Sequence, residues 1–313
     1  MTRIIFMGTP ELAGVSLQAL LRVPKFQVVA VVTQPDQPKG RGLKLQPSPV
    51  KEIALHGNLP VLQPARARDE PFLEQLRELQ PDLIAVAAYG QILPQSILDL
   101  PRFGCLNVHT SLLPKYRGAS PIQRAVLNGD TESGVTIMKM DAGMDTGDIL
   151  TQETTAILPE DNSQTLHDRL AQIGANLLAR TIPDYVAGKI QPRPQPMDGV
   201  SHAAKIKKSD GQIDWSQSAR SVWNLVRGMT PWPGAFTFLS GQTPPVLLKI
   251  WQAEVAPQSG TPGEILLADK TGIVVGCGEE SLRVLAVQRE GGRRLTAQEF
   301  LAGHPLPAGQ KLG

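Results

Sequence analysis

Cysteine and long apolar runs are both scarce in this chain of 313 residues. Its two cysteines, Cys105 and Cys277, are too few and too far apart for a disulfide framework, which suits a reducing cytoplasm. No apolar run approaches the roughly 20 residues that a membrane-spanning helix needs. The first residues also lack the apolar stretch and cleavage site of a secretory signal. We therefore expect a soluble, cytoplasmic protein.

Metal, nicotinamide and cysteine chemistry are also disfavoured. No cluster of Cys and His has the spacing of metal ligands, so we expect no metal site. Gly8, Thr9 and Pro10 follow the first apolar run, but the glycine spacing of the dinucleotide-binding fingerprint is missing. Free cysteine usually packs as a small apolar residue, so burial of Cys105 is favoured over a nucleophilic role.

The first part of the chain alternates strand-like and helix-like segments. Short apolar runs at 4–7, 28–33, 83–88 and 135–140 have the composition of buried parallel strands. Helix-like segments lie at 11–23 and 71–79, and a third, at 163–187, closes this part of the chain. This order predicts an α/β domain with a doubly wound, Rossmann-like parallel sheet over residues 1–189.

The chain changes character after this domain. Proline occupies every second position at 192, 194 and 196, which blocks both helix and central strand, so we predict an extended linker over 190–206. Short strand-like pieces at 246–251, 272–275 and 281–287 follow, separated by proline and glycine. Residues 207–313 are therefore predicted to form a small β-domain, and spacing alone leaves a barrel and a sandwich both open.

Asn107, His109 and Asp145 form the candidate catalytic set. If 105–109 is a strand, Asn107 and His109 share a face, because side chains alternate along a strand. One offers an amide donor, and the other an imidazole that could either accept a proton near neutral pH or stabilise negative charge. Asp145, from a later loop, would fix the imidazole tautomer and stabilise its charged form. Each residue alone also has a structural explanation, as a core histidine, a turn asparagine or a loop acid.

The run from Ser111 to Ile122 (SLLPKYRGASPI), with Asn107 and His109 before it and Asp145 after it, resembles the folate-dependent formyltransferases. Within that family it is most similar to the members that act on methionyl-tRNA. The resemblance implies that these three residues are catalytic, that 10-formyltetrahydrofolate is the formyl donor and that initiator methionyl-tRNA is the acceptor. It also implies that the C-terminal domain is an OB-like barrel that binds tRNA. The implied folate-pocket residues are Ser111, Leu112, Leu113 and Pro114.

Basic residues give a modest indication of a nucleic-acid partner. From residue 205 onward the chain has 12 Lys and Arg against 9 Asp and Glu, a small surplus for such a domain. The loop over 34–51 is rich in proline and glycine. The family resemblance implies a tRNA-contacting insertion at this place, and residues 40–42 match the core of that insertion. Solvated surface charge is the alternative for each basic cluster. The candidate tRNA contacts are Lys39, Arg41, Lys44, Lys207, Lys208, Arg293 and Arg294.

Two other functions compete with formylation of methionyl-tRNA. One is formyl transfer to an amino-sugar nucleotide, against which the basic loop argues. The other is a non-catalytic RNA-binding protein on the same scaffold, against which the intact catalytic set argues. We expect a monomer, because no spare amphipathic segment indicates an interface. Trp232, which lies between two prolines, is expected to pack as a corner of the barrel.

Overall fold

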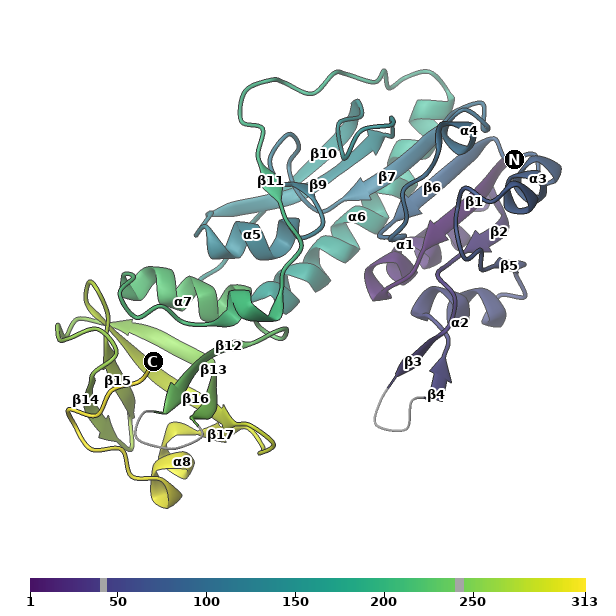
Figure 1. The fold of residues 1–313 in the computed structure, drawn as a ribbon. Coiled ribbons are helices and arrows are strands. Elements are labelled where there is room, and N and C mark those ends of the chain that lie inside the picture. The colour runs from purple at the N-terminus through teal and green to yellow at the C-terminus, as the bar shows by residue number, and fades with distance from the viewer. Residues whose placement is uncertain (40–43, 240–244) are drawn as a thin grey trace. The chain divides into compact units, whose positions relative to one another are not determined.

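The computed structural model describes residues 1–39, 44–239 and 245–313, and this part of the chain forms two compact units (Figure 1). The first comprises 1–121, 132–156 and 167–203. The second comprises 122–131, 157–166 and 204–313. Within the described residues, no helix is long and apolar enough to cross a membrane.

A seven-stranded sheet with the order β10-β9-β7-β6-β1-β2-β5 forms the centre of the first unit. The five strands from β7 to β5 are parallel, which confirms the predicted α/β class. The bounds are β1 Thr2–Gly8, β2 Phe26–Val32, β5 Val61–Leu62, β6 Leu83–Ala87, β7 Cys105–His109, β9 Glu132–Lys139 and β10 Ile149–Ala156.

The prediction of a parallel strand at 135–140 was wrong in direction. β9 covers this run but lies antiparallel to both β7 and β10. Most of β9 is buried. A strand that is buried on both faces carries a continuous apolar run whichever way it points, so its composition could not reveal its direction.

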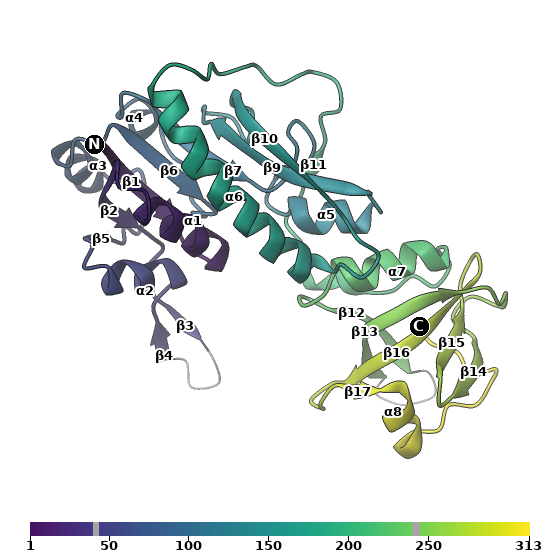
Figure 2. The same ribbon diagram turned by 180° about the vertical axis from the view of Figure 1, so that it is seen from behind.

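Helices cover both faces of the sheet. They are α1 Glu11–Leu21, α2 Pro49–His56, α3 Glu70–Glu78, α4 Gln95–Leu98 and α6 Ser163–Val186. The three helices predicted from the sequence are confirmed to within two residues at each end. On one face Cys105 packs in a cluster with Phe72 of α3 and Ile97 of α4. On the other face lies α6 (Figure 2), where a Cβ on Gly174 would come within 2.7 Å of Val108 Cγ1.

Short elements complete the first unit. The β-hairpin of β3 Gln37–Lys39 and β4 Lys44–Gln46 lies between β2 and α2, and β8 Arg117–Gly118 pairs in parallel with β11 His202–Ala203. The sheet reverses its winding between β1 and β6, where ligands of open α/β sheets usually bind. At that edge Thr9 Oγ1 donates to the Tyr89 carbonyl over 3.1 Å, which joins the loops after β1 and β6.

The second unit is an antiparallel β-barrel with the strand order β12-β13-β16-β15-β14, and β17 pairs with β16. Residues near the end of the chain join its two edge strands, because Leu312 pairs with Leu239 of β12 and Lys311 pairs with Glu264 beside β14. The bounds are β12 Ala235–Leu239, β13 Val246–Ala256, β14 Ile265–Asp269, β15 Gly272–Gly276, β16 Ser281–Arg289 and β17 Leu295–Thr296. The helices of this unit are α5 Pro121–Leu127, η1 Lys208–Gly211, α7 Ala219–Gly228 and α8 Ala297–Gly303.

Barrel closure makes Leu312 a stability determinant. Its side chain is 6% exposed and packs in the barrel core, whereas Leu267 on β14 is 43% exposed. We predict that Leu312→Ala lowers the free energy of unfolding by about 2–4 kcal/mol, and that Leu267→Ala changes it by less than about 1 kcal/mol. All four tryptophans of the chain lie in this unit, so urea titration followed by tryptophan fluorescence reports on the barrel. Equal midpoints for the two variants would contradict closure by Leu312.

Candidate active site

Asn107 and His109 lie at the carboxyl end of β7, which has the bounds predicted from the sequence. Asn107 is paired with Val86 of β6 and Met138 of β9, so it occupies an interior position of the sheet. Its side chain is partly exposed, and no hydrogen bond joins its amide to another residue in the described part of the chain. The amide is therefore a fixed hydrogen-bond donor that is available to a ligand.

His109 is 5% exposed and has a different partner on each ring nitrogen. Nε2 lies 3.0 Å from the carbonyl oxygen of Tyr116, and because a carbonyl only accepts, Nε2 carries the proton. Nδ1 lies 3.7 Å from Asp145 Oδ1. The Tyr116 carbonyl thus selects the tautomer, a task that the sequence analysis gave to Asp145. A proton taken up by His109 goes to Nδ1, where it faces the carboxylate.

Asp145 is held by the backbone on the other side of its carboxylate. Oδ2 accepts a hydrogen bond of 2.8 Å from the backbone N–H of Gly118, which leaves Oδ1 directed at His109. Asp145 has a φ of 54°, a left-handed conformation that Asp tolerates better than most residues. Gly118 has a φ of 118°, and a Cβ there would lie 2.9 Å from the Ala203 carbonyl oxygen, so this position requires glycine.

Gln195 fixes the loop that carries Asp145. Its Nε2 donates to the backbone carbonyls of Asp145 and Gly147, each over 2.8 Å. Its Oε1 accepts from the Arg117 guanidinium, over 3.1 Å from Nε and 2.8 Å from Nη2. One amide thereby connects the Asp145 loop to Arg117, which precedes Gly118 in β8.

Most of the segment predicted as a linker, up to residue 203, therefore belongs to the first unit. Arg193 exchanges two backbone hydrogen bonds with Ile149, and Ser201 Oγ accepts from the Tyr116 N–H over 2.9 Å. The segment 193–203 thus supports both the Asp145 loop, through Gln195, and Tyr116, whose carbonyl binds His109. Sequence reasoning missed these contacts, since alternate prolines indicated only an extended chain.

The segment from Ser111 to Pro114 is held by internal hydrogen bonds. Thr136 Oγ1 donates to the Ser111 carbonyl over 2.7 Å and accepts from the Leu113 N–H over 3.1 Å. Ser111 Oγ donates to the Lys115 carbonyl over 2.6 Å. Ser111, Leu113 and Pro114 are buried, and Leu113 also lines a cavity of about 240 Å³, whereas Leu112 is partly exposed. The segment is therefore a rigid wall with few polar side-chain atoms available to a ligand.

Both cysteines are buried. Burial, with a smaller contribution from Asp99, raises the pKa of Cys105 to about 12, and burial raises the pKa of Cys277 to about 11. Thiols with such pKa values are protonated at neutral pH, so neither is an activated nucleophile. Across the described residues, no three His, Cys, Asp or Glu side chains are grouped so as to hold a metal ion.

The candidate tRNA contacts fall in both units. The backbones of Lys39 and Lys44 are paired across the β3–β4 hairpin. Arg41 lies outside the described residues. In the second unit Arg293 is 3.4 Å from Glu299, and the Arg294 guanidinium lies 4.1 Å above the Trp251 ring.

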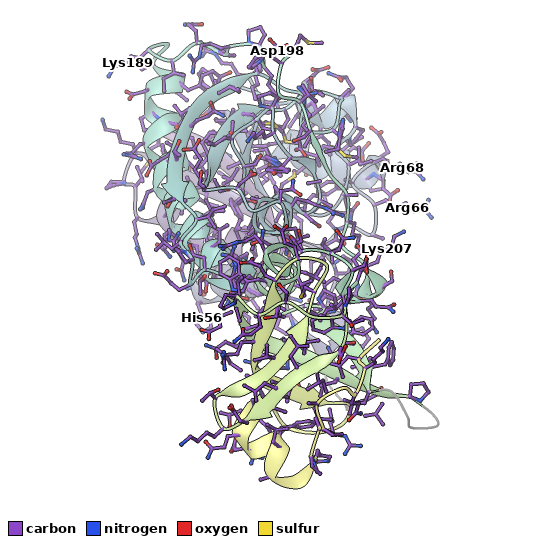
Figure 3. The ribbon with its side chains drawn as sticks, turned by 90° about the vertical axis from the view of Figure 1, so that its left-hand side faces the viewer. His56, Arg66, Arg68, Lys189, Asp198 and Lys207 are labelled. Carbon is purple, nitrogen blue, oxygen red and sulfur yellow. The ribbon has the colours of Figure 1, made fainter. Side chains whose placement is uncertain are left out.

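Figure 3 shows the side chain of Lys207 of the second unit, one residue before η1, which begins at Lys208. The same view shows Arg66 and Arg68, two exposed residues of the first unit that the sequence analysis did not single out. They follow β5 at the carboxyl edge of the sheet, where ligands of such sheets bind.

Trp232 corrects another expectation. Its side chain is 51% exposed, so it is not a packed corner of the barrel. By contrast Trp215 is buried, and its indole N–H donates to Thr237 Oγ1 over 3.1 Å. The flanking prolines set the backbone at Trp232, and they do not determine which way the ring faces.

Comparison with known families agrees with the fold. Residues 2–182 match the formyl transferase family, and residues 205–305 match the formyl transferase C-terminal domain. Methionyl-tRNA formyltransferase from Geobacter sulfurreducens is 50% identical to this protein, and the match covers 99% of this chain and 96% of the relative. That from Caldanaerobacter subterraneus is 49% identical over 98% of each chain. The chain belongs to the formyl transferase family, in the group of the methionyl-tRNA formyltransferases.

Solved structures of lower identity share the fold. A sugar 3N-formyl transferase crystallised with dTDP and 5-N-formyl-THF superimposes with a TM-score of 0.67, at 19% identity, over 92% of this chain and 98% of that one. HypX from Aquifex aeolicus in complex with tetrahydrofolic acid gives a TM-score of 0.60 at 16% identity, over 99% of this chain and 50% of that one. At these identities the likeness establishes the architecture alone.

Proposed function

We propose that this protein transfers the formyl group of 10-formyltetrahydrofolate to the α-amino group of methionyl initiator tRNA, for the initiation of translation. The observation that carries the proposal is the catalytic set at the carboxyl end of β7. There the Asn107 amide, which has no hydrogen-bond partner among the described residues, lies two residues from an imidazole with a defined tautomer, and Asp145 faces that imidazole. Family membership and the names of the relatives support the choice of substrates.

The Asn107 amide is assigned to the formyl oxygen. When the amine attacks the formyl carbon, a C–N bond forms and the carbonyl electron pair moves onto oxygen, which becomes an oxyanion. A pre-aligned donor stabilises that charge more than it stabilises the neutral carbonyl, and is typically worth about 3–4 kcal/mol. The interior position of Asn107 in the sheet supplies the alignment.

His109 and Asp145 are assigned to the proton of the amine. Nδ1 of His109 accepts the proton that the attacking nitrogen loses, and the resulting imidazolium lies between two acceptors, the Asp145 carboxylate and the Tyr116 carbonyl. Collapse of the tetrahedral intermediate restores the C=O bond, breaks the bond to the folate nitrogen and returns a proton to that nitrogen. General acid–base catalysis of this kind contributes about 10²–10⁴-fold.

The remaining assignments concern binding. The folate supplies a formyl group on a nitrogen that leaves readily once protonated. Leu112, the partly exposed member of the Ser111–Pro114 wall, is the best placed of the four to contact it. The acceptor tRNA is assigned to the basic residues of both units, through phosphate contacts that weaken as salt rises. They are Lys39, Arg41, Lys44, Lys207, Lys208, Arg293 and Arg294.

Gln195 is predicted to be a positioning residue for Asp145. Gln195→Ala removes hydrogen bonds to Arg117, Asp145 and Gly147, so the carboxylate should lose its fixed distance to His109. We predict a fall in kcat of about tenfold, as expected for roughly 1–2 kcal/mol of lost hydrogen bonding, with little change in the KM for the folate. Gln191→Ala is the control, because Gln191 is exposed and bonds only the nearby Gly188 carbonyl among the described residues. Equal kcat values for the two variants would show that Gln195 does not position Asp145.

Product analysis tests the proposed function directly. The protein is incubated with 10-formyltetrahydrofolate and methionyl initiator tRNA, the ester bond of the tRNA is hydrolysed, and the released amino acid is identified by mass spectrometry. N-formylmethionine is the expected product. Recovery of unmodified methionine, with the donor consumed or intact, would refute the proposal.

A further inference from the structure

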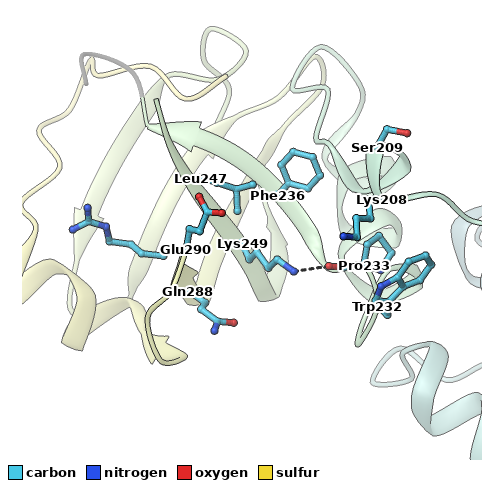
Figure 4. Close-up of a pocket in the computed structure, with 11 residues that line it drawn as sticks. Lys208, Ser209, Trp232, Pro233, Phe236, Leu247, Lys249, Gln288 and Glu290 are labelled. Carbon is cyan, nitrogen blue, oxygen red and sulfur yellow. Dashed lines mark hydrogen bonds between the residues drawn. The ribbon is translucent and has the colours of Figure 1, made fainter. Parts of the chain in front are cut away.

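The second unit contains a cavity of about 510 Å³ beside β12, β13 and β16 (Figure 4). Its apolar lining includes the side chains of Trp232, Phe236 and Leu247, and its polar lining includes Lys208, Lys249 and Gln288. This volume lies within the range of about 300–1,000 Å³ that small-molecule sites occupy. The cavity lies in the barrel unit and shares no residue with the catalytic set.

Trp232 offers an aromatic face on a well-supported turn. Lys249 Nζ donates to the Pro233 carbonyl over 2.6 Å, as Figure 4 shows, and the Gly234 N–H donates to the Met229 carbonyl over 2.9 Å. Gly234 has a φ of 84°, which favours glycine. An exposed indole with its backbone held in this way loses little conformational entropy when a planar ring stacks on it.

Two other tryptophans of this unit are already covered by cations. Trp251 lies beneath the Arg294 guanidinium at 4.1 Å, and Trp223 lies beneath Arg227 at 3.7 Å. No cation–π contact of this kind involves Trp232 within the described chain. Trp232 therefore retains an open face.

The charges around the cavity favour an anion. Lys208, Lys249 and Arg289 are among its lining residues, and Glu290 is the one acidic residue among the described residues that line it. The Arg289 guanidinium contacts His304 Nε2 over 2.5 Å, whereas Lys249 Nζ lies at the Pro233 carbonyl, next to Trp232. An aromatic face with cations beside it fits a planar base that carries a phosphate, which is the chemistry of a nucleotide.

We propose that this cavity binds one unpaired nucleotide of the acceptor RNA, with its base stacked on Trp232 and its phosphate beside Lys208 and Lys249. The inference deepens the proposed function and rests on it. A base within a duplex hides both faces in the stack, so the site selects a nucleotide that is outside a helix. It also gives the barrel a role beyond general attraction to phosphates.

Substitution of Trp232 tests the proposal through tRNA affinity. Trp232→Ala should raise the Kd for initiator tRNA by about 5- to 30-fold, because stacking of one base contributes about 1–3 kcal/mol. Trp232→Phe, which keeps an aromatic face, should stay within about threefold of the wild type. Leu267→Ala is the matched control, since it removes another exposed apolar side chain of the barrel, and it should leave the Kd unchanged. A wild-type Kd for Trp232→Ala would overturn the proposal.

A second readout uses tryptophan fluorescence and a single-stranded RNA tetranucleotide. Binding should quench the wild-type emission, Trp232→Phe should bind with most of this quenching lost, and an RNA duplex of the same sequence should quench much less. No quenching of the wild type, or equal quenching by the duplex, would overturn the cavity assignment. The proposed function fails separately, if the wild type does not formylate methionyl-tRNA. If the wild type formylates methionyl-tRNA and Trp232→Ala keeps the wild-type Kd, only the cavity proposal is refuted.

Discussion

Replacing Asn107 with Asp is expected to lower the kcat for formyl transfer by at least about 10²–10³-fold. The change is nearly isosteric, so residue 107 should keep its pairing with Val86 and Met138 in the sheet. It replaces a hydrogen-bond donor with an anion at the point where the reaction creates negative charge. Both effects raise the barrier, and neither should affect binding of the neutral formyl group as strongly.

The matched variant is Asn107→Ala, which removes the donor without adding a charge. It should lose about 10²-fold or more in kcat, and Asn107→Asp should be the slower of the two. Thermal midpoints of both variants should stay near that of the wild type, since the Asn107 side chain is partly exposed. Near-normal turnover by Asn107→Asp would refute the oxyanion role.

Replacing Asp145 with Asn is expected to reduce kcat by about 10²-fold or more. The amide oxygen of Asn can still accept the 2.8 Å hydrogen bond from Gly118, so the loop should keep its position. The negative charge that faces His109 Nδ1 is lost, and an imidazolium that forms there is no longer stabilised. The loss should appear in steady-state kcat at saturating folate and tRNA.

Asp141→Asn is the control for this prediction. Asp141 lies four residues earlier in the same loop, is exposed, and bonds the backbone of Gly143 and the hydroxyl of Thr146. Its substitution should change kcat by less than about threefold. Similar losses for both variants would mean that the carboxylates act on the loop as a whole rather than on His109.

Local periodicity was sufficient to predict the strand that carries Asn107 and His109. β7 has the predicted bounds, and alternation along it places Asn107 and His109 on one face because strand geometry depends only on neighbouring residues. The same applies to the predicted helices, whose apolar spacing is a local property. The placement of residues along a single strand or helix could therefore be predicted from the sequence.

Contacts between distant segments could not be predicted. Gln195 follows Asp145 by 50 residues along the chain, and its role depends on how the backbone of 193–203 returns to the sheet. The group that binds His109 Nε2 is a backbone carbonyl, which leaves no residue signature. Exposure of Trp232 and the closure of the barrel by Leu312 are likewise decided by tertiary packing.

Acceptor competition under single-turnover conditions tests the central claim most directly. The protein is mixed with labelled 10-formyltetrahydrofolate and equal concentrations of methionyl initiator tRNA and an amino-sugar nucleotide in water, and every labelled product is quantified. The account predicts label on the methionyl-tRNA, with little on the sugar or in released formate, and loss of that product in Asn107→Asp. Label on the sugar or in formate, with the methionyl-tRNA unmodified, would contradict it.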